Sequence, residues 1–272
     1  MHSSWNCLHK WVVRYGDDEQ VDVETLNRML QQFDVASETS SKCIAHHFAA
    51  IADSQAVLLF LLQNTPQTLV NKRNKNGQTP LFWACFSMHS ALKNFKLLLK
   101  YGSNPKHVDS SGNTVLHAAI ENGNFQLVSF IVSKSLCLLD TPNGEGLTPL
   151  KLACERSEAH IISRLVKLAV GTSSLCELIR EYTKQDDTIV VASLIRHATA
   201  AQCTDEKGRN PLHVAVLLNK YNVVKKILSQ HSAEHCWFDQ VDSEGRTAAQ
   251  SMTTNTKPKI RSLLTNHVPC TH

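Results

Sequence analysis

One short phrase recurs along this chain and constrains its fold more than any other feature. Each copy begins with a glycine, continues through one variable residue to Thr or Asn, and then enters an apolar segment. The copies lie at residues 77–81, 112–116, 146–150, 208–212 and 245–249. Their glycines are 35, 34, 62 and 37 residues apart, and 62 is close to two periods of 31. A period of this length predicts a solenoid, in which each unit packs its apolar faces against its neighbours.

The phrase has the residues that a turn leading into a helix requires. Glycine suits a turn residue with positive φ, because it has no Cβ. Thr or Asn can cap the helix that follows, and Pro80, Pro149 and Pro211 fit the first helical position. A second apolar segment at helical spacing follows most copies, at 95–99, 127–131, 161–166 and 223–228. The predicted unit is therefore turn, helix, turn, helix.

This unit resembles the ankyrin repeat, a β-turn plus two helices with the signature T-P-L-H-x-A. His117 and His213 match the signature histidine, whereas Phe82 and Lys151 replace it in two other copies. The resemblance covers about residues 74 to 264, apart from one degenerate stretch. It implies an all-α fold, an ankyrin-type solenoid of helix pairs joined by short β-hairpin-like turns. It also implies that His117 and His213 form hydrogen bonds within and between neighbouring turns.

The predicted organisation is an N-terminal helical cap at 1–37 followed by a solenoid at 38–272. Within the solenoid the expected repeats are 40–72 (degenerate), 74–106, 109–141, 143–172, 173–203 (degenerate), 205–238 and a C-terminal cap at 242–266. The N-terminal cap is predicted from apolar residues at helical spacing, first from Trp5 to Tyr15 and then, after Asp22, from Leu26 to Phe33. An autonomous peptide-binding or dimerising element is the alternative for this stretch. In the second degenerate unit, Ser174 and Glu177 suggest a capping box.

Composition narrows the function classes. The net charge of +4 is mild for 272 residues and does not by itself require a nucleic-acid partner. No apolar run reaches the ~20 residues that span a bilayer, and the first residues lack the pattern of a signal peptide. The nine cysteines have no paired spacing. Several, such as Cys85 and Cys154, fall at expected core positions, so we expect the cysteines to pack as small apolar residues. This use of cysteine is typical of a reducing compartment, the cytoplasm or the nucleus.

Histidines and cysteines cluster at two places, which raises the question of a metal site. The clusters are Cys43, His46 and His47, and His231, His235 and Cys236. Structural zinc sites usually take two paired groups of ligands, and no C-x-x-C occurs in the chain. No nucleophile motif, P-loop or dinucleotide motif is present either. We therefore expect no metal, no cofactor and no enzymatic activity.

Basic residues gather around the turn before residue 77. Lys72, Arg73 and Lys75 lie there, and Lys106 begins the next turn. Two interpretations are open, a solvated face and a site for an acidic peptide. Nucleic acid is less favoured, because no aromatic residues that could stack on bases interleave with these side chains.

The resemblance implies protein–protein recognition by an adaptor or regulatory scaffold, whose partner lies against the turn tips and the first helices. The partner is expected to be a protein, and the sequence leaves the oligomeric state open. Phe86 stands at a variable position, where core packing is the alternative to partner contact. The other variable turn and inner-helix positions predicted to bind the partner are Lys75, Asn76, Gln78, Ser87, Ser110, Ser111, Asn113, Glu121, Asn122, Glu145, Leu147, Glu155, Arg156, Glu206, Lys207 and Arg209.

Three other interpretations remain open. The chain is the ankyrin-repeat portion of a larger protein whose activity resides in another domain, or it self-associates through its N-terminal helices, or it is a metal-dependent enzyme.

Overall fold

The computed structural model describes residues 10, 12, 23–32, 34–53, 55–134, 139–169, 172–197, 203–230 and 237–266. These residues form α-helices, one 3₁₀-helix and irregular turns. They contain no β-strand, only an isolated β-bridge between Val241 and Thr247. The chain divides into two compact units, residues 1–152 and 153–272, with the boundary inside one helix. This confirms the all-α solenoid class.

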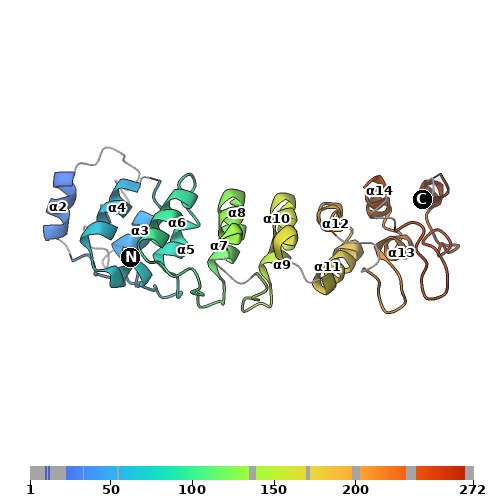
Figure 1. Ribbon diagram of the computed structural model, residues 1–272, viewed down its shortest axis with the longest axis horizontal. Coiled ribbons are helices and arrows are strands. Elements are labelled where there is room, and N and C mark those ends of the chain that lie inside the picture. The colour runs from blue at the N-terminus through green and yellow to red at the C-terminus, as the bar shows by residue number, and fades with distance from the viewer. Residues whose placement is uncertain are drawn as a thin grey trace. The chain divides into compact units, whose positions relative to one another are not determined.

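Unit 1 consists of helix pairs in which a short first helix is followed by a longer second one (Figure 1). The elements are α2 (Val23–Gln32), α3 (Ala45–Ile51), α4 (Gln55–Asn64), η1 (Gln67–Asn71), α5 (Pro80–Ala84), α6 (Ala91–Lys100), α7 (Val115–Glu121), α8 (Phe125–Ser133) and the first residues of α9 (Pro149–Glu155). The pairs α3–α4, α5–α6 and α7–α8 correspond to the first three predicted repeats. In the first of them, α4 ends at Asn64, two residues before Pro66, as the sequence predicts.

The core of unit 1 lies between successive helix pairs. Leu81 and Leu116 on the first helices and Leu98 and Ile131 on the second helices are fully buried. Between α6 and α8, the rings of Phe95 and Phe130 meet edge to face with centroids 6.3 Å apart. Apolar residues at helical spacing are thus buried against the next repeat, which is why a period in the sequence becomes a stack in space.

Unit 2 continues the same pattern of helix pairs. Its elements are the last residues of α9, then α10 (Ala159–Ala169), α11 (Thr172–Gln185), α12 (Thr188–Ile195), α13 (Pro211–Leu217), α14 (Tyr221–Ser229) and α15 (Pro258–Thr265). The degenerate repeat is therefore a real helix pair, α11–α12. The predicted capping box is wrong, because α11 already begins at Thr172 and Ser174 lies inside it. The residues from Asp242 onward have no first helix, and α15 closes the unit with Ile260 and Leu264 buried.

A disulfide in unit 2 corrects the expectation for the cysteines. Cys176 on α11 is bonded to Cys203, with Cα atoms 5.0 Å apart and a sequence separation of 27. The sequence missed this pair because the two residues belong to the two ends of one degenerate repeat and have no characteristic spacing. Cys43, Cys85 and Cys154 are buried and outside any disulfide, as expected of small apolar core residues.

The predicted N-terminal cap is only partly described. Its second helix is α2, Val23–Gln32, which follows Asp22 as the spacing predicts. The first predicted helix, from Trp5 to Tyr15, lies almost entirely outside the described residues.

Candidate protein-binding surface

The turns that precede the first helices are built around one Asn or Asp side chain each. In the turn of Gly112, the Asp109 carboxylate accepts hydrogen bonds from the backbone N–H groups of Ser111 and Asn113, at 2.9 and 2.8 Å. The same pair of bonds recurs in the other four turns, where the central residues are Asn74, Asn143, Asp205 and Asp242. Each of these residues stands three positions before the turn glycine, a signal that the sequence analysis passed over.

The glycines of these turns have the predicted backbone conformation. The φ angles of Gly77, Gly112, Gly146, Gly208 and Gly245 lie between +68° and +77°. The Asn or Asp side chain three positions before the glycine therefore closes the turn through its hydrogen bonds. The glycine reverses the chain direction, so that the turn tip has one defined shape.

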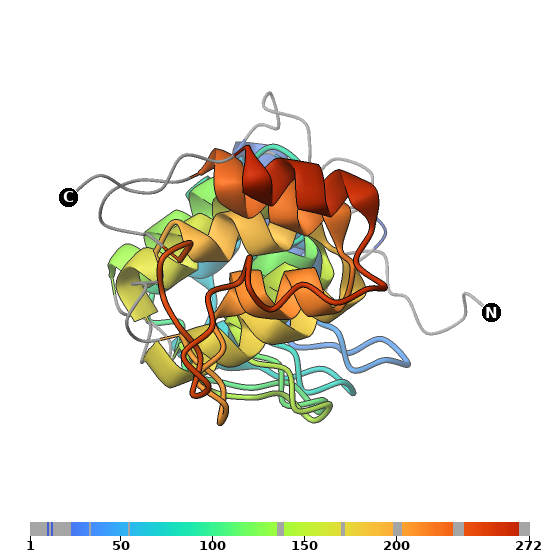
Figure 2. The same ribbon diagram turned by 90° about the vertical axis from the view of Figure 1, so that its right-hand side faces the viewer.

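Neighbouring turns are joined by hydrogen bonds between their backbones. In unit 1 the N–H of Lys75 donates to the carbonyl of Ser41 (2.9 Å), that of Ser110 to Asn76 (2.8 Å) and that of Gly144 to Ser111 (2.7 Å). Figure 2 shows these turns of unit 1, coloured blue to yellow-green, side by side. In unit 2 the N–H of Ser243 donates to Lys207 in the same way (2.9 Å). The turn tips form a ladder, which fixes the spacing of the side chains that they carry.

The signature histidines connect each first helix to the next turn. In unit 1, His117 Nε2 lies 3.0 Å from the carbonyl oxygen of Leu147 and its Nδ1 lies 2.9 Å from Thr114 Oγ1, the helix cap. In unit 2, His213 Nε2 lies 2.9 Å from the carbonyl oxygen of Arg246. The predicted bond to the next turn is confirmed for both histidines, and His47 of the degenerate first repeat makes the same contact with Gln78. The ring bond within the turn is confirmed for His117, whereas His213 Nδ1 is buried without a hydrogen-bond partner in the described part of the chain.

The repeat with Phe82 shows what the histidine contributes. Thr79 stands at the cap position there, but its hydroxyl is buried and has no hydrogen-bond partner within the described part of the chain. Phe82 itself is buried, so packing has replaced the polar contact in this repeat.

Most of the predicted partner-binding residues are on the surface. The exposed ones are Lys75, Asn76, Ser110, Ser111, Glu121, Asn122, Glu145, Glu155, Arg156, Glu206 and Lys207, and the half-buried ones are Gln78, Phe86, Asn113, Leu147 and Arg209. Ser87 differs from the rest, because it is buried and its hydroxyl donates to the Asp53 carboxylate at 2.9 Å. Its role is to connect two loops, and its side chain is not part of a surface.

Five of these side chains are engaged within the fold. The Ser110 hydroxyl donates to the carbonyl oxygen of Asn76 in the preceding turn at 2.9 Å. The Gln78 side-chain oxygen accepts from Trp83 Nε1 at 3.1 Å. Asn113 accepts from the Asn143 amide in the next turn at 2.9 Å, and Asn122 donates to a backbone carbonyl at 2.9 Å. Arg209 donates to the Asp205 carboxylate, with the closest N–O distance 2.7 Å. These residues shape the surface, whereas the exposed residues between them are available to a partner.

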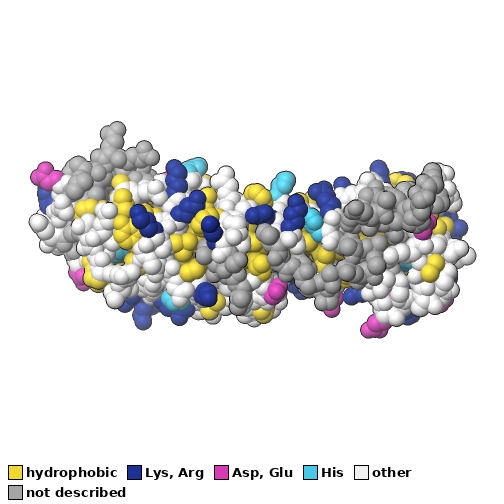
Figure 3. Space-filling model, in the orientation of Figure 1, with side chains coloured by type: hydrophobic (Ala, Val, Ile, Leu, Met, Phe, Trp, Pro, Cys, Tyr) yellow, Lys and Arg dark blue, Asp and Glu magenta, His cyan; other side chains and the backbone are white. Residues whose placement is uncertain are grey.

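Two cationic side chains of the basic turn are engaged within the fold. The Lys72 ammonium lies 2.8 Å from the Glu38 carboxylate, and Arg73 donates to a backbone carbonyl at 2.5 Å. The pair with Lys72 lowers the pKa of Glu38. Elsewhere on unit 1, Figure 3 shows Lys and Arg side chains gathered over the part that contains α6, which carries the exposed Lys93, Lys96 and Lys100.

The cluster of Cys43, His46 and His47 is held by hydrogen bonds of the fold. His47 Nε2 lies 3.1 Å from the Gln78 carbonyl oxygen, and His46 Nε2 lies 2.9 Å from Thr65 Oγ1. Burial, with the nearby His47, lowers the pKa of His46 to about 4, so this ring is neutral at physiological pH. No group of three or more potential metal ligands is placed to hold an ion among the described residues, and the second cluster, from His231 to Cys236, lies outside them.

The class of the protein follows from this geometry and from comparison with known proteins. A model of ankyrin repeats in three copies matches residues 8–108 and again 88–174, and a single-repeat ankyrin model matches residues 207–240. The chain belongs to the ankyrin-repeat family. The repeats of this family are protein–protein interaction modules. None of the described helices combines the length and the apolar character needed to cross a membrane.

Similar proteins are much longer than the stretch they share with this chain. The chain is 26% identical to nuclear factor NF-kappa-B p105 subunit of Gallus gallus over 155 residues, 54% of this chain and 16% of that protein. It is 40% identical to palmitoyltransferase Hip14 of Drosophila melanogaster over 98 residues, 36% of this chain and 15% of that protein. It is 28% identical to Rabankyrin-5 of Mus musculus over 142 residues, 52% of this chain and 10% of that protein. The chain thus spans about a sixth or less of these relatives.

Proposed function

We propose that this chain is an adaptor or regulatory scaffold that binds a protein partner through its turn tips and first helices. The observation that carries the proposal is the ladder of backbone hydrogen bonds between consecutive turns. Because the ladder and the Asn or Asp side chains fix each tip, the exposed side chains are held in place before a partner arrives. Less conformational entropy is then lost on binding.

Consecutive tips of unit 1 carry different side chains in the two positions before the turn glycine. Lys75 stands two residues before Gly77, and Ser111 and Glu145 stand one residue before Gly112 and Gly146. Lys75, Ser111 and Glu145 are exposed, while the backbones of their turns make the bonds that hold the ladder. The side chains can therefore vary without disturbing the turns. A row of basic, polar and acidic groups at fixed spacing favours recognition of one partner in one orientation.

The test is a pulldown with quantitative mass spectrometry that compares the chain with two triple variants. One replaces Lys75, Ser111 and Glu145 by Ala, and the matched control replaces Gln63, Lys100 and Gln126, exposed residues of the second helices, by Ala. We expect proteins that are retained by the chain and the control but lost from the turn variant. If both variants retain the same proteins, or the control loses them instead, the assignment to the turn tips is refuted.

A second proposal is that the chain is the ankyrin-repeat portion of a larger protein whose activity lies in another domain. It is supported by the relatives, of which this chain matches 10 to 16%. Mapping of full-length transcripts tests it, and a transcript that encodes these 272 residues alone would refute it.

A further inference from the structure

A pocket of about 280 Å³ lies within unit 2, between the end of α11 and the turn before α13. The lining residues on α11 are Arg180 and Lys184, the turn contributes residues 205–207 and 209, and Val214 of α13 is the apolar member. These elements are the first helices and the turn of adjacent repeats, the same kinds of element that carry the proposed binding surface. The volume is below the range of about 300–1,000 Å³ that is typical of small-molecule sites, and it suits a side chain of a partner better.

The charges of the pocket are unbalanced toward positive. It has four cationic side chains, of Arg180, Lys184, Lys207 and Arg209, and two carboxylates, of Asp205 and Glu206. One carboxylate is already used by its own turn. Asp205 binds the Arg209 guanidinium as well as two backbone N–H groups.

The pKa of Asp205 supports this description of its role. Burial alone would raise the pKa, but the hydrogen bonds from Arg209 and from the backbone N–H groups of Arg209 and Lys207 outweigh burial, and the pKa is lowered. Asp205 is therefore ionised and neutralises Arg209. The ammonium groups of Lys184 and Lys207 have no hydrogen-bond or ion-pair partner among the residues that the structure describes, so they are the cations that face an incoming ligand.

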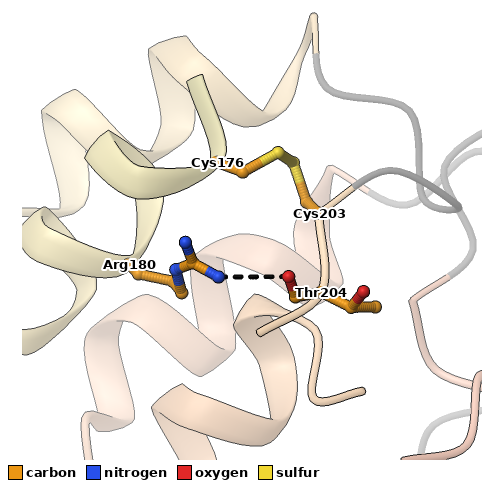
Figure 4. The surroundings of a disulfide bond; sticks show 4 residues. All are labelled: Cys176, Arg180, Cys203 and Thr204. Carbon is orange, nitrogen blue, oxygen red and sulfur yellow. Dashed lines mark hydrogen bonds between the residues drawn. A yellow bond between two sulfur atoms is a disulfide. The ribbon is translucent and has the colours of Figure 1, made fainter. Parts of the chain in front are cut away.

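Two bonds hold the walls of the pocket together, as Figure 4 shows. The disulfide joins Cys176 of α11 to Cys203, and one turn further along α11 the Arg180 guanidinium donates to the carbonyl of Thr204 at 3.1 Å. The segment that enters the turn is thereby fixed against the helix that carries Lys184. Because the two cationic walls are already fixed, little conformational entropy is lost in ordering them when a ligand binds.

We propose that this pocket binds an acidic segment of the partner polypeptide, with a carboxylate side chain placed between Lys184 and Lys207. The proposal rests on the proposed function, since it names the chemistry of the partner at one place on the binding surface. A carboxylate supplies the negative charge that the two lysines lack, and its aliphatic stem can contact Val214.

The test uses the whole chain, labelled with ¹⁵N, and two dodecapeptides followed by NMR. One peptide carries Glu at four positions in a Gly/Ser sequence, and the other carries Gln at the same positions. We expect the Glu peptide, and not the Gln peptide, to shift the amide signals of residues 180–184 and 205–209. Inorganic phosphate is titrated separately, because a simple anion site would respond to it.

Three variants should differ in their effect on the affinity for the Glu peptide. Lys184→Glu/Lys207→Glu should weaken the Glu peptide on the order of ten-fold, since each exposed ion pair contributes a few-fold. Lys225→Glu/Lys259→Glu changes the net charge equally on exposed residues outside the pocket lining, and should change the affinity much less. Asp205→Asn keeps a side-chain oxygen for the turn, as Asn74 and Asn143 do, but frees the Arg209 charge, and should strengthen binding roughly two- to five-fold.

The outcomes separate the inference from the proposed function. The inference is overturned if the Glu peptide binds elsewhere, if both lysine pairs have equal effects, or if phosphate binds and the peptide does not. In those cases a partner whose retention depends on the turn tips of unit 1 would leave the proposed function in place. Unchanged thermal unfolding of the variants shows that any loss of binding is not a loss of fold.

Discussion

The spacing of the turn ladder predicts that two glycines with the same backbone conformation differ in what they tolerate. Gly112 and Gly146 occupy the same position in consecutive turns of unit 1, with φ of +77° and +76°. A Cβ on Gly112 would lie 3.0 Å from the backbone N of Gly144 and 3.4 Å from Asn143 backbone atoms. A Cβ on Gly146 would meet no described atom within 4 Å. The perturbation is therefore Gly112→Ala, with Gly146→Ala as its matched control.

The expected magnitudes follow from two separate costs. Positive φ costs an alanine about 1–2 kcal/mol, and both variants carry this cost. At Gly112 the neighbouring turn must also move, which weakens the hydrogen bond from Gly144 N–H to the Ser111 carbonyl, now 2.7 Å long. A lost hydrogen bond of this kind costs about 1 kcal/mol. We expect Gly112→Ala to lower the free energy of unfolding by about 2–3 kcal/mol and Gly146→Ala by about 1–2 kcal/mol.

The assay is equilibrium unfolding in urea followed by far-ultraviolet circular dichroism. Both substitutions lie in unit 1, so they act on the same part of the chain, and the slope of each transition checks that the variants unfold in the same way. Equal losses for the two variants would refute the reasoning, because they would show that the close approach of the turns adds nothing to the backbone strain.

Unit 2 contains a second pair of the same design. A Cβ on Gly208 would lie 3.0 Å from the backbone N of Ser243, whereas one on Gly245 would meet no described atom within 4 Å. Gly208→Ala should again cost more than Gly245→Ala. Agreement between the two pairs would attribute the difference to the ladder rather than to the sequence around one turn.

Three further results are expected. Cys176→Ser opens a loop of 27 residues, and the chain-entropy relation gives a loss of about 3–4 kcal/mol in the free energy of unfolding. Dithiothreitol should lower the melting temperature of the native chain to a similar extent and leave that of the variant unchanged. A native chain whose melting temperature does not respond to the reductant would contradict the disulfide. The pKa of His46 is lowered to about 4, so between pH 6.5 and 4 the unfolded chain binds more protons than the folded chain. The free energy of unfolding should therefore fall by up to about 1.4 kcal/mol for each unit that the pH falls in this range. The same pH dependence in His46→Gln would contradict this. Asp187 caps α12 by accepting from two backbone N–H groups, so Asp187→Ala should cost about 1–2 kcal/mol and speed amide hydrogen exchange in α12 more than in α14; equal exchange in both helices would contradict it.

The repeating unit could be predicted from the sequence because its signals are local. Glycine at positive φ, a capping Thr or Asn and proline at the first helical position each act within a few residues, and the structure confirms the turn at all five copies. The signature histidine could also be placed, since its partner lies one period away. The capping box at Ser174 failed because the degenerate repeat has lost the glycine that marks where the helix begins.

What the sequence could not supply is the pairing of side chains across the turns. The two interpretations of the basic turn, a solvated face and a site for an acidic peptide, both left out Glu38 and a backbone carbonyl, which come from other turns and bind Lys72 and Arg73. The inverse holds in unit 2, where Glu206 and Lys207 are exposed and Arg209 is half-buried, but the sequence did not show their neighbours on α11.

These two cases have one physical explanation. A charge in a repeat protein is surrounded by side chains of the adjacent repeats as well as of its own, so its net effect depends on the register between repeats. In unit 1 the register brings an acid to Lys72. In unit 2 it brings Lys184 of α11 to the pocket that Lys207 also lines, and Asp205, one of the two acids of that pocket, is already bound to Arg209. The sequence of a single turn therefore gives the charges that are present, and the neighbouring repeat decides which of them remain available to a partner.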